Sequence, residues 1–84
     1  MEIIKYPLST EKAIRLMESE NKLLFVVDRK AKKSEIKHAI EEMFNVKVED
    51  VKTFISTKKQ EKRAYVKFAL DTPAIDLATK LGLM

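Results

Sequence analysis

The pattern of apolar and polar positions predicts a long amphipathic helix in the middle of the chain, within residues 32–44. Ser34 and Glu35 suit its start as a capping residue and a first-turn carboxylate. Asn45 tolerates the left-handed backbone that commonly ends a helix. Between them, apolar side chains recur at the three- and four-residue spacing of one helix face, namely Ile36, Ala39, Ile40, Met43 and Phe44. We expect the rest of the chain to cover this stripe.

Two strands are expected before this helix. Ile3, Ile4 and Tyr6 indicate a short first strand, which Pro7 should end. Residues 22–27, KLLFVV, are apolar at both alternating positions. Such a run is typical of a central strand that is covered on both faces.

Two more strands are expected after the helix. Residues 46–53 are rich in β-branched residues, but the parity of the apolar positions changes within them, so we expect a bulge or a turn at Glu49 and Asp50. Residues 56–62 read as a charged hairpin loop. Apolar and polar residues then alternate strictly over residues 63–70, and the inner face of this strand would be formed by Ala64, Val66, Phe68 and Leu70.

Two shorter helices complete the pattern. Ser9 or Thr10 is expected to cap the first one, whose inner side would be formed by Ala13, Ile14 and Met17. Thr72 and Pro73 are a suitable N-cap and first position for the closing helix, and Gly82 suits its end. Its inner side would be formed by Ile75, Ala78 and Leu81. The resulting order, β-α-β-α-β-β-α, predicts an α+β fold in which helices pack on a mostly antiparallel, four-stranded sheet.

Composition narrows the class of protein. Eighty-four residues suffice for a single domain, so we expect one domain over residues 1–84. The absence of cysteine rules out disulfides and thiolate chemistry within this sequence. No stretch resembles a signal peptide or a membrane span, so we expect a cytoplasmic protein without direct membrane insertion.

The sequence predicts no enzyme, metal site or cofactor. His38 is the single histidine and flanks the apolar stripe, so we interpret it as a partly buried structural residue. The carboxylates are scattered among lysines and match no calcium-loop pattern. One glycine cannot form a phosphate-binding loop, which also argues against a small phosphatase or ligand-sensing domain.

The basic residues are better organised than the acidic ones. Five positive charges face one negative charge, Glu35, at the start of the central helix, where backbone N–H groups also favour phosphate: Arg29, Lys30, Lys32, Lys33 and Lys37. A second cluster opposes Glu61 with four cations: Lys58, Lys59, Lys62 and Arg63. Each cluster alone is compatible with a solvated surface. Together, on a domain of net charge +4, they favour nucleic-acid binding.

One strand resembles a known RNA-binding element. Residues 64–68, AYVKF, match the tail of a strand signature of RNA-recognition motifs, in which Tyr65 would stack on a base between Arg63 and Lys67. The glycine and the first aromatic residue of that signature are missing, and the element order differs. An ordinary strand with a half-exposed Tyr65 is therefore the favoured interpretation, and a free-standing single-strand RNA binder is the alternative.

Several segments together resemble the ribosomal protein L23 family of the large subunit. They are residues 7–13 (PLSTEKA), 21–23 (NKL), 33–37 (KSEIK) with Ala39, 44–48 (FNVKV), Val51 and Thr53. The resemblance extends from about Ile3 to Gly82. Bacterial members carry a long basic hairpin between the last two strands, whereas the loop here is short, so the chain resembles the archaeal form.

The resemblance implies a structural role on the ribosome. Such proteins bind large-subunit ribosomal RNA beside the polypeptide exit tunnel, next to neighbouring large-subunit proteins. By resemblance and by the two basic clusters, the expected RNA contacts are Pro7, Ser9, Thr10, Lys12, Asn21, Lys22, Arg29, Lys30, Lys32, Lys33, Lys37, Lys52, Thr53, Lys58, Lys59, Lys62 and Arg63. Glu11 matches a residue that docks exit-site factors. Here its partner would be the signal recognition particle or the membrane translocon.

Overall fold

The computed structural model describes residues 3–56 and 60–82. Its elements follow the predicted order β-α-β-α-β-β-α and confirm an α+β fold. Their bounds are β1 Ile4–Leu8, α1 Glu11–Glu20, β2 Lys22–Val27, α2 Lys33–Phe44, β3 Val48–Ser56, β4 Glu61–Phe68 and α3 Ala74–Lys80.

The four strands form one antiparallel sheet in the order β1-β2-β4-β3. β2 lies inside the sheet, and its residues from Leu23 to Val27 are all buried, as the continuous apolar run predicts. On β4 the alternation is also confirmed, because Ala64, Val66 and Phe68 are fully buried while the residues between them are partly exposed. These two strands supply most of the sheet's apolar surface.

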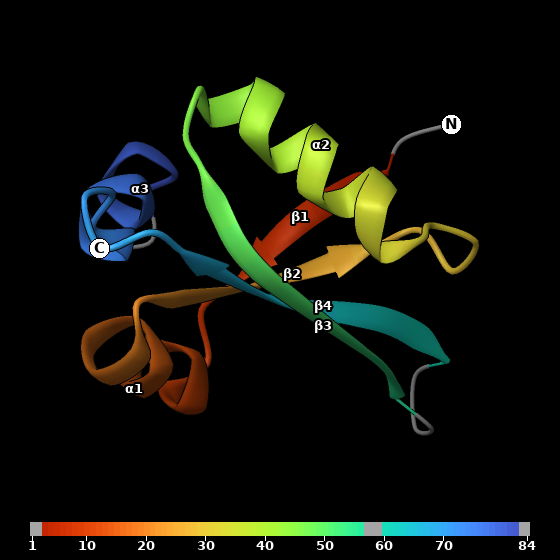
Figure 1. Ribbon diagram of the computed structural model, residues 1–84. Coiled ribbons are helices and arrows are strands. Elements are labelled where there is room, and N and C mark those ends of the chain that lie inside the picture. The colour runs from red at the N-terminus through yellow and green to blue at the C-terminus, as the bar shows by residue number, and fades with distance from the viewer. Residues whose placement is uncertain (1–2, 57–59, 83–84) are drawn as a thin grey trace.

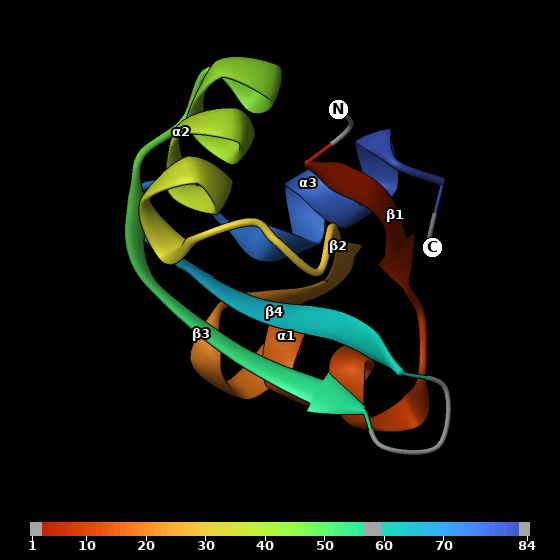
Figure 2. The same ribbon diagram turned by 90° about the vertical axis from the view of Figure 1, so that its right-hand side faces the viewer.

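Helices cover both faces of the sheet, but unequally. Figures 1 and 2 show α2 on one side and α1 on the other, with α3 near one end of the sheet. The main core lies under α2, where Ile36 and Ile40 are fully buried against Phe25 and its neighbours. α1 packs mainly on β2, and α3 contacts both β2 and α1. Among the described helices, α2 is the one that packs on β3.

Local chemistry sets the helix ends. Thr10 rather than Ser9 caps α1, because its Oγ1 accepts a hydrogen bond of 3.1 Å from the N–H of Ala13. Asn21 and Asn45 end α1 and α2 with left-handed backbones (φ 58° and 54°), and Gly82 has φ 76° just after α3. The predicted cap at Ser34 is wrong, because α2 begins at Lys33 with Lys32 as its N-cap.

The strand bounds differ from the prediction in β1, β3 and β4. β3 spans Val48–Ser56 rather than residues 46–53, and β4 begins at Glu61, within the expected hairpin loop. β1 continues through Pro7 to Leu8, which is possible because an edge strand leaves one row of N–H positions unpaired. The expected irregularity at Glu49 and Asp50 is a β-bulge, where the β3–β4 register shifts. β4 ends at Phe68, so Leu70 is not on its inner face but in the following turn, 91% exposed.

Several residues assigned to inner helix faces are exposed. Met43 is 56% exposed on α2, Ile14 38% on α1 and Ile75 44% on α3. Each of these residues lies beside buried residues of the same helix. The predicted helical period is therefore correct, but the buried stripe is narrower or shorter than predicted. His38 is also exposed rather than partly buried, which removes its predicted structural role.

Candidate nucleic-acid interface

The predicted cluster at the start of α2 forms one exposed basic surface, which we call the basic helix start: Arg29, Lys30, Lys32, Lys33 and Lys37. All of these residues are exposed. None of them forms an ion pair with another residue in the described ranges. Lys33 and Lys37 line a shallow pocket together with Glu49 and Asp50 of β3. Because none of the five cations is held in an ion pair there, their side chains are available to phosphates.

The backbone at this helix start is less available than the sequence suggests. Oε1 of Glu35 accepts a hydrogen bond of 2.9 Å from the N–H of Lys32, and Oδ1 of Asp28 accepts one of 2.8 Å from the N–H of Lys30. These carboxylates occupy donors that a phosphate would otherwise use. Phosphate binding here would rest on the lysine and arginine side chains.

The second predicted cluster is divided by the alternation of β4. Lys62 joins the basic helix start, because its Nζ donates a hydrogen bond of 2.6 Å to the carbonyl of Ala31. Arg63 points to the other side of the sheet, where its guanidinium pairs with Glu61 at 2.8 Å. Lys58 and Lys59 lie outside the described residues.

A second surface lies on β3 and β4, on the side of the sheet that carries α1. The register places Lys52 opposite Tyr65 and Phe54 opposite Arg63. Lys12 reaches this face from α1, with its Nζ 5.9 Å from the centre of the Tyr65 ring. We call the group Lys12, Lys52, Phe54, Arg63 and Tyr65 the open sheet face. It combines cations with exposed aromatic surface, as nucleic-acid-binding sheets do.

The aromatic pair on this face was not expected from the sequence. The rings of Phe54 and Tyr65 stack with centres 5.2 Å apart, and Phe54 is 38% exposed. The Tyr65 ring is thus already in contact with Phe54 and Lys12, which weakens the alternative in which Tyr65 itself stacks on a base. The alternation of apolar and polar residues in β4 predicted that Tyr65 points outward. The bulge in β3 changes which residues of that strand face the same side, so the sequence did not indicate that Phe54 lies beside Tyr65.

Other expected contact residues are spread over the molecule. Ser9 is exposed, and Pro7 lies in the edge strand β1. Lys22 forms an ion pair with Glu20 at 3.3 Å. Thr53 lies next to Lys52 in β3, so the two side chains point to opposite faces of the sheet. RNA on one face of the sheet would therefore contact Lys52 or Thr53, but not both side chains.

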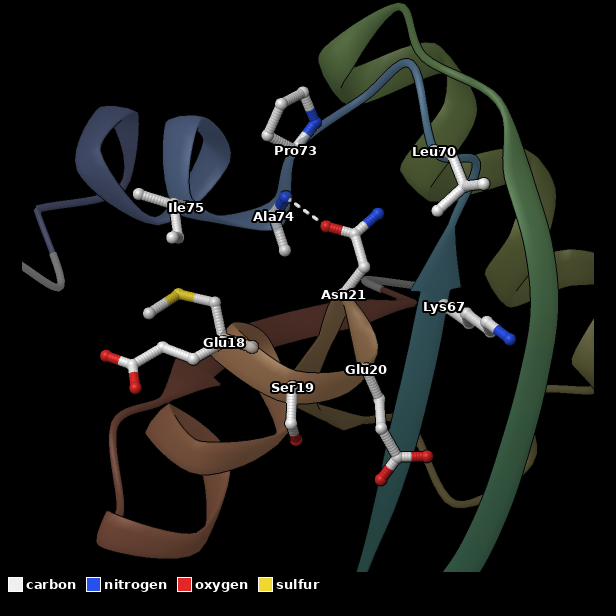
Figure 3. Close-up of a pocket in the computed structure, with 10 residues that line it drawn as sticks. Glu18, Ser19, Glu20, Asn21, Lys67, Leu70, Pro73, Ala74 and Ile75 are labelled. Carbon is white, nitrogen blue, oxygen red and sulfur yellow. Dashed lines mark hydrogen bonds between the residues drawn. The ribbon is translucent and has the colours of Figure 1, made fainter.

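Asn21 has an internal role that the sequence did not indicate. Its Nδ2 lies 3.1, 3.1 and 3.0 Å from the carbonyl oxygens of Phe68, Ala69 and Thr72, and its Oδ1 accepts a hydrogen bond of 2.6 Å from the N–H of Ala74. Figure 3 shows this last bond at the start of α3. Asn21 thus provides the helix cap that was assigned to Thr72 and has little capacity left for RNA.

Glu11 lies in the first turn of α1, as predicted. Its side chain is 89% exposed and forms an ion pair of 3.7 Å with Arg15, one turn further along the helix. An exposed pair of this kind contributes little stability. Glu11 is therefore open to a partner in solution.

The described part of the chain offers little chemistry beyond these surfaces. Residues 3–56 and 60–82 contain no group of acidic or histidine side chains arranged to hold a metal ion. Within the same ranges, each helix is too short or too polar to cross a lipid bilayer.

The fold and its surfaces define a small α+β protein with a basic, partly aromatic exterior. The family profile of ribosomal protein L23 matches residues 2–75. The chain is also 43% identical to the large ribosomal subunit protein uL23 of Methanococcus aeolicus over 82 residues, which cover 98% of this chain and 94% of that protein. The chain belongs to the ribosomal protein L23 family.

Membership confirms the resemblance seen in the sequence. The protein is a structural, non-enzymatic component of the large ribosomal subunit, in agreement with the expected ribosomal location in the cytoplasm. The alignment covers nearly the full length of both this chain and the Methanococcus protein, so that relative does not contain a long additional hairpin. This agrees with the short, archaeal-like form.

Proposed function

We propose that this protein binds large-subunit ribosomal RNA through the basic helix start and the open sheet face, beside the polypeptide exit tunnel and next to neighbouring ribosomal proteins. The observation that carries the proposal is the basic helix start, where five exposed cations have no acidic partner among the described residues. An arrangement of this kind supplies the electrostatic part of RNA binding.

The two surfaces are adjacent at one end of the sheet. Val27 ends β2 just before the basic helix start and lies opposite Lys62, and the next pair in the register joins Val26 to Arg63 on the open sheet face. Lys62 also contacts Ala31 within the connection to α2. One RNA segment that follows this end of the sheet would therefore meet both surfaces.

The surfaces would contribute differently. Lysines at the basic helix start neutralise phosphates and release counterions, which gives affinity that depends strongly on salt. On the open sheet face, the exposed side of Phe54 offers apolar contact to a base or a sugar, and Lys52 and Arg63 fix the backbone nearby. The role is structural, because no bond is broken in either contact.

We also propose that Glu11 contributes to docking of an exit-site factor, either the signal recognition particle or the membrane translocon. Its high exposure supports this assignment. A carboxylate beside RNA phosphates would be repelled, whereas the same charge on an outer rim would raise the rate and the specificity of protein association.

The experiment that tests RNA binding is co-sedimentation with large subunits after a high-salt wash. We compare the wild-type protein with the triple variant Lys32→Gln, Lys33→Gln, Lys37→Gln. The control variant, Lys5→Gln, Lys47→Gln, Lys80→Gln, removes the same charge from three other exposed positions.

We expect the control variant to remain with the subunits and the variant of the basic helix start to be washed off at lower salt. Equal retention of the two variants would contradict the proposed role of the basic helix start.

A further inference from the structure

A groove lies at the opposite end of α1 from Glu11, between the end of that helix and the start of α3. Its volume is about 450 Å³, within the range of pockets that hold apolar groups. Its apolar lining comes from Met17, Leu70, Pro73, Ala74 and Ile75. Figure 3 shows Leu70, Pro73, Ala74 and Ile75 around Asn21, which joins the two segments.

Three of the apolar residues that line the groove, Leu70, Pro73 and Ile75, are exposed, whereas Met17 and Ala74 are buried. The backbone that carries the exposed ones is held in position. Leu70 is 91% exposed and Ile75 44% exposed. The turn that carries Leu70 is held on both sides, because Asn21 Nδ2 bonds to the carbonyls of Ala69 and Thr72, and the N–H of Thr72 donates to Ala69. A segment with a fixed backbone loses little conformational freedom when a partner covers it, which favours its use as an anchor.

The rim of the groove is acidic, although the protein as a whole is basic. Glu18 and Glu20 line it, of which Glu20 is paired with Lys22 at 3.3 Å. Two more exposed carboxylates, Asp71 and Asp76, are not in the lining but directly follow Leu70 and Ile75 in the chain. Lys67 is the cation in the lining, and it is already paired with Glu49 at 3.7 Å. Phosphates would be repelled here, so the groove is not a continuation of the RNA-binding surfaces.

We propose that this groove docks a cationic amphipathic segment of another protein. Apolar side chains of that segment would cover Leu70 and Ile75, and its lysines or arginines would lie against Glu18 and Asp76. Proteins that neutralise RNA phosphates are rich in such cations, so partners of this chemistry are expected in a ribosomal subunit. The proposal rests on family membership for its setting and does not depend on the two RNA surfaces.

The probe is a synthetic amphipathic helix of leucine and lysine, with a second peptide in which glutamate replaces every lysine. Binding to the full chain is measured by fluorescence anisotropy, and the contact is located by methyl NMR. We expect the cationic peptide to bind, the acidic peptide not to bind, and the methyl signals of Leu70 and Ile75 to shift.

Two pairs of variants locate the site. Leu70→Ser should weaken peptide binding by about tenfold, whereas Ile55→Ser, which alters an exposed apolar residue of β3, should not. Likewise Glu18→Lys should weaken it, whereas Glu42→Lys on the exposed side of α2 should not. Equal effects within either pair would overturn the proposal.

Two further measurements distinguish the groove from the RNA surfaces and from self-association. Binding of ribosomal RNA should be unchanged in Leu70→Ser, so a failure of the groove and a failure of the RNA surfaces are distinguishable. Sedimentation equilibrium should give a monomer. A dimer that Leu70→Ser dissociates would mean that a second copy of this chain occupies the groove, and would overturn the proposal.

Discussion

Asn21 shows how one residue can join distant parts of the chain. Its left-handed backbone ends α1, and its side chain holds the turn after β4 and the first N–H of α3. Asn45 has the same backbone conformation at the end of α2, but no side-chain hydrogen bond is found for it within the described residues. The two asparagines therefore separate the effect of backbone conformation from that of side-chain bonding.

We predict that Asn21→Gly lowers the free energy of unfolding by about 2 kcal/mol, because glycine keeps the left-handed backbone but leaves polar groups without partners. The matched variant Asn45→Gly should change it by less than about 0.5 kcal/mol. Urea denaturation measures both. Similar losses in the two variants would mean that the Asn21 side chain does not stabilise the junction.

Glu11 tests the proposed docking surface at the same scale. Glu11→Lys should leave incorporation into large subunits nearly intact, because the residue lies on an exposed part of α1. It should slow the recruitment of signal recognition particle, since it reverses a rim charge. Its loss from the first helical turn costs only about 0.3–1 kcal/mol of stability.

Stopped-flow binding to purified subunits measures this recruitment, with Glu42→Lys as the charge-matched control. Lost incorporation would place Glu11 on the RNA side. Unchanged recruitment would mean that Glu11 does not dock this factor.

At the scale of elements, α2 provides the main contact with the sheet. Ile40 is fully buried at the middle of the helix, whereas Met43 belongs to the same periodic stripe and is 56% exposed. We predict that Ile40→Ala costs about 2–5 kcal/mol of folding free energy, the usual range for a buried large-to-small change. Met43→Ala should cost less than about 0.5 kcal/mol, which is typical of exposed positions.

Thermal and chemical unfolding of the two α2 variants gives this comparison directly. Equal losses would show that the buried stripe extends over the last turn of α2, contrary to the structure.

The sequence predicted the elements well because their signals are local. Period, caps and turn residues depend on near neighbours, so the element order, the left-handed ends at Asn45 and Gly82, and the bulge near Glu49 could all be predicted. The exposure of Met43 could not be predicted, because periodicity defines the apolar face of a helix but not how far the sheet extends beneath that face.

The candidate site was less predictable because it depends on which strands become neighbours. Pairing of β3 with β4 brings Phe54 onto Tyr65, and α1 brings Lys12 above that ring. Asn21 was predicted to contact RNA, but its partners lie about fifty residues further along the chain. Such contacts follow from the tertiary arrangement and leave no signal in local spacing.

At the scale of the whole molecule, charge is distributed unevenly over the surface. The net charge is only +4, yet the basic helix start holds five exposed cations, while the groove between α1 and α3 has an acidic rim. A protein that lies between RNA and other proteins needs such a division, because phosphates and basic partners require opposite charges. A uniformly basic surface would bind RNA on all sides.

Binding of RNA phosphates by the basic helix start is best tested by the salt dependence of RNA binding. The affinity of the purified protein for a large-subunit ribosomal RNA fragment is measured over a series of salt concentrations. The wild type is compared with the Gln triple variant at Lys32, Lys33 and Lys37 and with the control triple variant at Lys5, Lys47 and Lys80. We predict that the first variant flattens the log–log slope by up to about 0.9 for each lost duplex phosphate contact, and that the control does not. An unchanged slope in the first variant, or an equal change in the control, would show that the basic helix start does not bind RNA phosphates.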